Sequence, residues 1–140
     1  MTLPHAPAPF TVEIPVRWSD QDRNAHVNNA VVVTLIEEAR IQAMRALIGS
    51  TPDDALPRVV RSLAIDYLLP VHFGRALEAS VWITRLGNSS YTMRHVLSQA
   101  GRVCVQADAV IVQLNAEATA SHPLSRDYRT ILEGIFLPAD

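Results

Sequence analysis

A polar segment at residues 19–29, SDQDRNAHVNN, contains the side chains best suited to chemistry. Within five residues it places a carboxylate, a carboxamide and an imidazole, at Asp22, Asn24 and His26, directly before an apolar run with helical spacing. The first turn of a helix has unpaired N–H groups and about half a positive charge, so it can polarise a carbonyl or hold an oxyanion. A carboxylate beside it can attack that carbonyl or activate a water molecule. These residue types therefore permit acyl hydrolysis.

The same segment has two other interpretations. Asp20, Asp22 and Asn24 match the opening of a calcium-binding EF-hand loop, which then needs glycine at its sixth position and glutamate at its twelfth. Ala25 and Val31 occupy those positions, so the calcium interpretation fails. The second interpretation is turn chemistry, because Asp and Asn side chains satisfy free backbone N–H groups at turns and helix starts. Each residue taken alone fits that explanation, whereas their combination favours a site.

The element that positions this segment is a helix predicted over residues 30–48, which contain no glycine or proline. Asn28 or Asn29 is suited to cap its start, and Gly49 followed by Pro52 is suited to end it. Apolar residues follow helical spacing along it, at Val32, Leu35, Ile36, Ala39, Ala43 and Leu47. A helix with so broad an apolar stripe must be covered by the rest of the chain.

The remaining pattern indicates strands. Apolar residues alternate with polar ones over 11–18, where Pro15 predicts an edge strand or a bulge. A meander of four long strands is predicted over 59–69, 76–86, 91–99 and 103–114. Ser125 can cap a short C-terminal helix. Strands joined by tight turns pair antiparallel and the single long helix must cover one face, so the predicted class is α+β.

Composition bounds the organisation of the chain. Its 140 residues suffice for one domain, predicted over 11–140 and preceded by a loose, proline-containing arm at 1–10. Hydrophobic residues make up 49% and charged residues 19%, which excludes a disordered chain. The net charge of −2 argues against nucleic acid as a partner, and the basic residues, all arginine, argue against a polybasic membrane anchor.

The single cysteine, Cys104, cannot form an internal disulfide, which favours a reducing cytoplasm. No apolar run reaches the roughly 18 residues that a membrane span needs, and no export signal is visible at the start. Cys104, Trp18 and Trp82 are predicted to be packing residues. His72 and His95 are predicted to lie on the surface or to line a pocket.

Residues 16–40, VRWSDQDRNAHVNNAVVVTLIEEAR, resemble the hotdog-fold thioesterases. They are most similar to 4-hydroxybenzoyl-CoA thioesterase and its bacterial acyl-CoA thioesterase relatives. The acyl-ACP thioesterases of plants share the pattern D-x-N-x-H-V-N-N, found here at 22–29. The strand IDYLLPV at 65–71, followed by FG at 73–74, also fits the bacterial relatives. The resemblance implies the hotdog fold, an antiparallel sheet wrapped around one long central helix.

The resemblance also implies roles for individual residues. Asp22 corresponds to the catalytic carboxylate, and Asn24 and His26 correspond to the residues that work with it in the plant enzymes. The plant enzymes carry a further glutamate that has no equivalent near residues 67–71, and the basic cluster with which bacterial relatives hold CoA phosphates is reduced here to Arg85. Substrate contacts are expected at the helix start and at the turn after the strand predicted over 76–86, from Asn28, Asn29, Ala30, Arg85, Ser89 and Ser90.

The function expected from this resemblance is hydrolysis of an acyl thioester, with coenzyme A as the carrier and acyl carrier protein as the alternative. No metal or organic cofactor is expected, and the expected assembly is a homodimer or homotetramer. A hotdog hydratase or dehydratase, or a non-catalytic acyl-binding domain, would share the same fold. The identity of the acyl group, and whether Asp22 acts as nucleophile or general base, stay open at this level.

Overall fold

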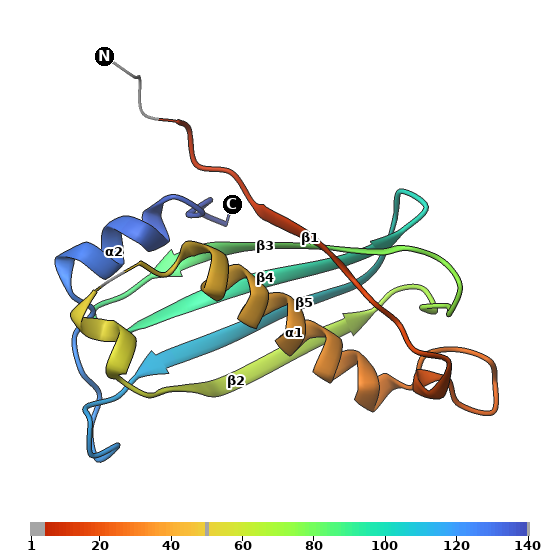
Figure 1. Ribbon diagram of the computed structural model, residues 1–140, viewed down its shortest axis with the longest axis horizontal. Coiled ribbons are helices and arrows are strands. Elements are labelled where there is room, and N and C mark those ends of the chain that lie inside the picture. The colour runs from red at the N-terminus through yellow and green to blue at the C-terminus, as the bar shows by residue number, and fades with distance from the viewer. Residues whose placement is uncertain (1–4, 50, 140) are drawn as a thin grey trace.

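The computed structural model describes residues 5–49 and 51–139 and has a five-stranded antiparallel sheet with a long helix across one face (Figure 1). The predicted α+β class is therefore confirmed. Residues 1–4 of the predicted N-terminal arm lie outside the described residues. The strands are β1 (Phe10–Ile14), β2 (Arg58–Tyr67), β3 (Leu77–Leu86), β4 (Ser90–Gln99) and β5 (Arg102–Gln113). The helices are η1 (Trp18–Asp20), α1 (Asn29–Leu47), η2 (Pro52–Ala55) and α2 (Arg126–Glu133).

The strand order is β1-β3-β4-β5-β2, and every pairing is antiparallel. β3, β4 and β5 form a meander as predicted, but the prediction that β2 belongs to it is wrong, because β2 pairs with β5 instead. Residues 68–76 between β2 and β3 form a long connection rather than a tight turn, so the two strands need not be neighbours. β1 lies at the opposite edge and ends directly before Pro15, as a proline in an edge strand predicts.

α1 begins where the sequence indicates. The side-chain oxygen of Asn28 accepts a hydrogen bond from the N–H of Ala30 at 2.8 Å, which makes Asn28 the N-cap. The apolar side of α1 is buried against the sheet, through Val32, Leu35, Ile36, Ala39, Ala43 and Met44. Within residues 5–49 and 51–139, no helix has the length and hydrophobicity of a membrane span.

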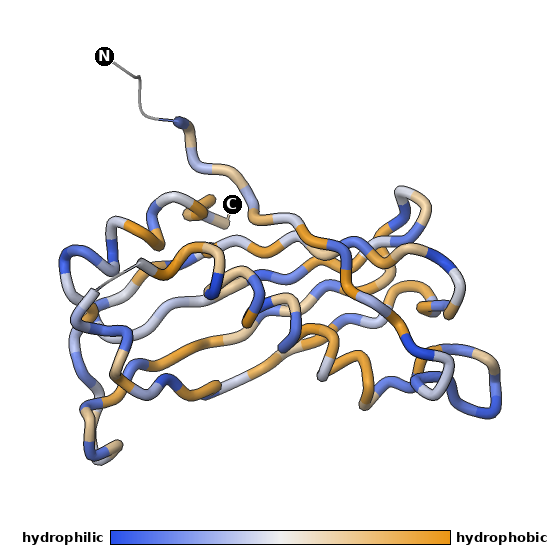
Figure 2. Tube along the Cα trace, viewed as in Figure 1, coloured by the Kyte–Doolittle hydropathy of each residue, from blue (hydrophilic) through white to orange (hydrophobic). Residues whose placement is uncertain are grey.

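Every second side chain of the strands faces α1. Figure 2 shows hydrophobic and hydrophilic residues alternating along the sheet. Cys104 is buried as predicted. The prediction that Trp18 is a packing residue is wrong, since its exposed fraction is 74%. The alternating strand ends at Ile14, so Trp18 belongs to η1 and no longer follows the pattern that would bury it.

The sequence predicts His95 on the surface or at a pocket, and this prediction is wrong, because His95 is fully buried beneath α1. Its Nε2 lies 3.4 Å from Nη1 of Arg40, and its Nδ1 lies 3.4 Å from the carbonyl oxygen of Ala107. The strand period explains this position, because His95 shares the inner face of β4 with Met93 and Leu97. Burial, together with the charge of Arg40, lowers the pKa of His95 from 6.5 to about 4.

The buried imidazole predicts a pH-dependent stability. Because the folded-state pKa of His95 lies below its unfolded value, its contribution is complete above about pH 6.5 and is lost as the pH falls toward 4. The shift corresponds to about 3 kcal/mol of unfolding free energy. His95→Gln should flatten the dependence of the denaturant midpoint on pH between 4.5 and 7, whereas His122→Gln, in an exposed loop, should not. An unchanged slope in His95→Gln would show that another group causes the acid sensitivity.

Candidate active site

A cavity of about 400 Å³ opens at the end of the sheet where α1 begins. The hydrophilic loop before α1 forms one wall, and Figure 2 shows it at that end of the molecule. Five of the predicted site residues line the cavity: Asp22, Asn24, His26, Asn28 and Asn29. The other wall comes from the end of β2 and the chain that follows it, through Tyr67, Leu68, Leu69, Pro70 and Val71. Polar groups from one segment therefore face a largely apolar wall from another.

The loop itself is a small hairpin. The N–H of Asp22 donates to the carbonyl of His26 at 2.8 Å, and Gln21 pairs with Val27 across the turn. The Asp22 carboxylate accepts a hydrogen bond from the N–H of Asn24 at 2.8 Å. Ala25 at the tip has a φ of +59°, a conformation that residues with a side chain adopt at some cost. These bonds hold Asp22 and His26 on the same short turn.

Two further backbone hydrogen bonds hold this hairpin, and one of them reaches a distant segment of the chain. The N–H of Val27 donates to the carbonyl of Val71 at 2.8 Å, which brings the loop against the segment after β2. The N–H of Asn28 donates to the carbonyl of Asp20 at 3.0 Å, which closes the loop onto its own start. The position of His26 and Asp22 is thus fixed relative to the opposite wall of the cavity.

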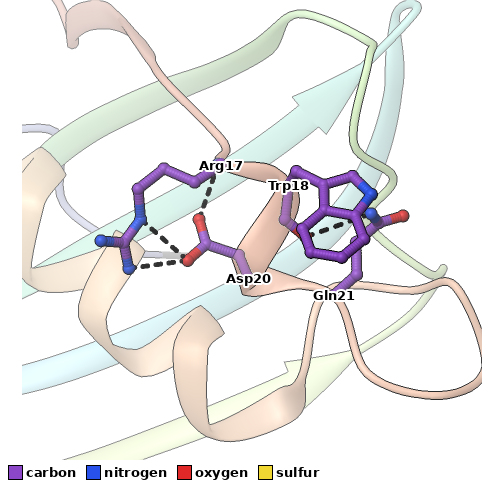
Figure 3. Close-up of polar contacts among 4 residues, drawn as sticks. All are labelled: Arg17, Trp18, Asp20 and Gln21. Atoms are coloured by element: carbon purple, nitrogen blue, oxygen red, sulfur yellow. Dashed lines mark hydrogen bonds and ion pairs between the residues drawn. The ribbon is translucent and has the colours of Figure 1, made fainter.

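Asp20 and Asp22 have different surroundings, although they are two residues apart. Asp20 is buried and accepts hydrogen bonds from the backbone N–H, Nε and Nη2 of Arg17 (Figure 3). Burial alone raises the pKa of Asp20, but its hydrogen bonds and ion pair with Arg17 outweigh that effect and leave the pKa below its usual value. Asp20 is therefore a structural carboxylate, whereas Asp22 lines the cavity.

The helix start offers fewer donors than the sequence suggests. The N–H of Ala30 is already bound to Asn28, and Ala30 does not line the cavity, so its predicted contact with substrate is not supported. Among the residues that the structure describes, none accepts a hydrogen bond from the N–H of Asn29. The hydroxyl of Tyr67 donates to the carbonyl of Asn29 at 3.0 Å and so ties the end of β2 to the first turn of α1.

The other predicted substrate contacts lie elsewhere. Arg85 and Ser90 line a second cavity of about 380 Å³, together with Arg61, Ser62 and Thr92. Ser89 does not line it, and its carbonyl accepts a hydrogen bond from the N–H of Gln113. The Asp22 cavity includes the paired ends Tyr67 and Val105 of β2 and β5, whereas the second includes Ser62 and Val110, about 17 Å further along the same pair of strands. Within one chain, the predicted substrate contacts at the helix start and those around Arg85 therefore lie in different cavities.

Sequence reasoning missed Tyr67 and Arg61 as members of these cavities. Tyr67 lies inside the IDYLLPV match, and the alternation of β2 places it on the same face as Leu63 and Ile65. No local signal points to Arg61, which lines the same cavity as Arg85 because β2 pairs with β5 and a bulge interrupts β2 between Val60 and Ser62.

The chain is similar in sequence to known proteins. The model of the Thioesterase superfamily matches residues 24–106. The uncharacterized protein YsmA of Bacillus subtilis (strain 168) is 31% identical over 111 residues, which cover 78% of this chain and 75% of that protein.

The chain is also similar in structure to solved thioesterases. A predicted thioesterase from Bacillus stearothermophilus has a TM-score of 0.84 at 27% identity, covering 95% of this chain and 100% of that one. A thioesterase from Thermus thermophilus, solved with coenzyme A and zinc, has a TM-score of 0.78 at 29% identity, covering 89% and 92%. These matches confirm the predicted hotdog fold. Since the family model spans more than half of the sequence, the chain belongs to the Thioesterase superfamily.

Proposed function

We propose that this protein hydrolyses acyl thioesters of coenzyme A and that Asp22 supplies the catalytic carboxylate. The observation that carries the proposal is the meeting of three groups in one cavity: the Asp22 carboxylate, the His26 imidazole and the start of α1. The largely apolar wall from Leu68 to Val71 suits an acyl group. Asp20, the other carboxylate of the loop, is bound to Arg17 and does not line this cavity.

The mechanism uses the helix start as the electrophilic partner. The N–H of Asn29 and the positive end of α1 polarise the thioester carbonyl and stabilise the oxyanion that forms on it. Asp22 either attacks the carbonyl carbon, giving an acyl-enzyme that water then hydrolyses, or takes a proton from the water that attacks. In both routes the C–S bond breaks and the carrier leaves as a thiol. Asn24 and His26 orient the carboxylate or the water.

The carrier is proposed to be coenzyme A because a structural relative was solved with it and because this chain has a suitable anion site. Arg61 and Arg85 line one cavity with the hydroxyl-bearing residues Ser62, Ser90 and Thr92. In the part of the chain that the structure describes, neither arginine forms a salt bridge. Guanidinium and hydroxyl groups suit the phosphates of coenzyme A.

The separation of the two cavities supports a homodimer. β2 lies at an edge of the sheet, and its residues Val59 and Val60 are exposed. Antiparallel pairing of β2 with a second β2 would place the Arg61 end of one protomer beside the Asp22 end of its partner. A dimer, or a dimer of dimers, would therefore combine the carboxylate of one chain with the anion site of the other.

A panel of acyl-CoAs of different chain length and aromaticity tests the reaction class. We expect thiol release, measured with a free-thiol reagent, for at least one member. Hydration of an enoyl-CoA without thiol release would identify a hydratase, and binding without turnover would identify an acyl-binding domain. Either result would replace the proposed function.

Asp22→Asn tests the catalytic carboxylate. The substitution keeps the size of the side chain and its acceptor for the Asn24 N–H, but it removes the negative charge that attacks or takes the proton. We expect kcat to fall on the order of 10²- to 10⁴-fold with the fold and oligomeric state unchanged.

Asp20→Asn is the matched control. It should leave most of the turnover but lower the thermal unfolding midpoint, because Arg17 loses the charge of its buried partner. Equal losses of kcat in the two variants would place the catalytic carboxylate elsewhere.

Arg61→Gln and Arg85→Gln test the anion site. Each should raise KM for acyl-CoA about 3- to 10-fold with little change in kcat, and neither should affect hydrolysis of an acyl thioester of N-acetylcysteamine, which has no phosphate. Arg45→Gln, on the exposed side of α1, is the control. Equal effects on both substrates would mean that these arginines do not hold the carrier.

Light scattering tests the assembly. The wild-type protein should be a dimer or tetramer at micromolar concentration, and Val60→Lys on the exposed edge of β2 should shift it toward monomer with loss of acyl-CoA hydrolysis. A fully active monomer would contradict the shared site.

A further inference from the structure

His72 is a residue that neither the proposed mechanism nor the anion site uses, yet its ring packs directly on His26. The two imidazole centroids lie 5.1 Å apart, and the ring planes meet at 87°, so the edge of one ring faces the plane of the other. Edge-to-face contacts of this kind are attractive and depend strongly on orientation. His26 lines the Asp22 cavity, whereas His72 does not, so His72 can reach the reaction only through His26.

The backbone of His72 is itself held on both sides by one buried side chain. Gln99, at the end of β4, accepts a hydrogen bond from the N–H of His72 at 2.9 Å through its Oε1. Its Nε2 donates to the carbonyl of His72 at 2.8 Å and to that of Arg75 at 3.2 Å. Gln99 is 4% exposed. A buried side-chain amide whose oxygen and nitrogen both hydrogen-bond to the backbone of one residue fixes that residue relative to the sheet.

The neighbouring backbone bond aligns the two histidines. Val27, next to His26, donates its N–H to the carbonyl of Val71, next to His72. The two segments are thus joined at adjacent positions, and the ring contact extends this junction to the side chains. His26 is otherwise carried by a hairpin whose tip, Ala25, is in the left-handed conformation and is exposed.

We propose that His72 is a positioning residue, held in place by Gln99, that keeps the His26 imidazole in its working orientation over the Asp22 cavity. The inference rests on the proposed function, in which His26 orients the carboxylate or the attacking water. A catalytic group must be held within a narrow range of orientations, and a side chain on an exposed hairpin needs a partner on a rigid element to achieve this. The sheet supplies that partner through Gln99 and His72.

Kinetics of His72→Ala, His26→Ala and the double variant test the proposal. We expect His72→Ala to lower kcat about 3- to 10-fold with KM nearly unchanged, on the scale of one lost edge-to-face contact. Because His72 acts through His26, the double variant should lose no more than His26→Ala alone. Losses that multiply in the double variant would overturn the proposal.

His72→Phe provides the rescue, since it keeps a flat aromatic ring at the same backbone position, which Gln99 holds irrespective of the side chain. It should restore most of the kcat lost in His72→Ala. Phe73→Ala, at the adjacent exposed residue, is the matched control and should keep wild-type kcat. A His72→Phe enzyme as slow as His72→Ala would contradict a role for the ring contact.

An NMR measurement separates this inference from the proposed function. The ring ¹H–¹³C signals of His26, assigned with His26→Ala, should shift in His72→Ala and stay near their wild-type positions in Phe73→Ala, whatever the protein hydrolyses. Unchanged His26 signals in His72→Ala would overturn the ring contact. A shift in a protein that releases no thiol from any acyl-CoA would support the contact and reject the proposed function.

Discussion

The hydrogen bond from the N–H of Val27 to the carbonyl of Val71 joins the loop before α1 to the chain that leaves β2, and the candidate site depends on it. The two residues are far apart in sequence, so the bond exists only once the sheet has assembled. With the loop fixed there, Asp22, His26 and the first turn of α1 all face the wall that begins at Tyr67. The other backbone hydrogen bonds of the hairpin that the structure describes all join residues between 17 and 28.

The sheet, α1 and η2 form a rigid base for that junction because the buried polar side chains that the structure describes have hydrogen-bond partners. His95 lies between Arg40 and a backbone carbonyl. Asp53, buried in η2, accepts hydrogen bonds from the side-chain amide of Gln113 at 2.7 Å and from the backbone N–H of Ser125 at 2.9 Å, which fixes the start of α2. Satisfied buried groups of this kind favour one packing over others, since each becomes costly if its partner moves.

The surroundings of each carboxylate, rather than its residue type, decide what it can do. Asp20 has an arginine, three hydrogen bonds and burial, and these bind it to the structure. Asp22 has one bond from the backbone of its own turn and an open cavity before it. Asn29, in the first turn of α1, lines the same cavity as Asp22, and the positive end of the helix would favour the reaction at a carbonyl that we propose.

The sequence by itself determined the local parts of this protein. Short-range spacing, which depends on backbone geometry alone, predicted an asparagine cap at residue 28 or 29, the apolar stripe of α1 and the meander from β3 to β5. It also predicted the polar loop with Asp22 and His26. The gathering of loop residues at one cavity could be predicted because they are neighbours in the chain.

Only the tertiary structure decided which distant residues meet. The pairing of β2 with β5, the burial of His95, the contact of His72 with His26 and the cavity shared by Arg61 and Arg85 each join segments separated by more than ten residues. Local patterns carry no information on such pairs, because a strand can present the same alternation to either neighbour and a long connection permits several topologies. The sequence therefore indicated which chemical groups the candidate site contains. Long-range pairing determined which residues hold those groups in place and where the second cavity lies.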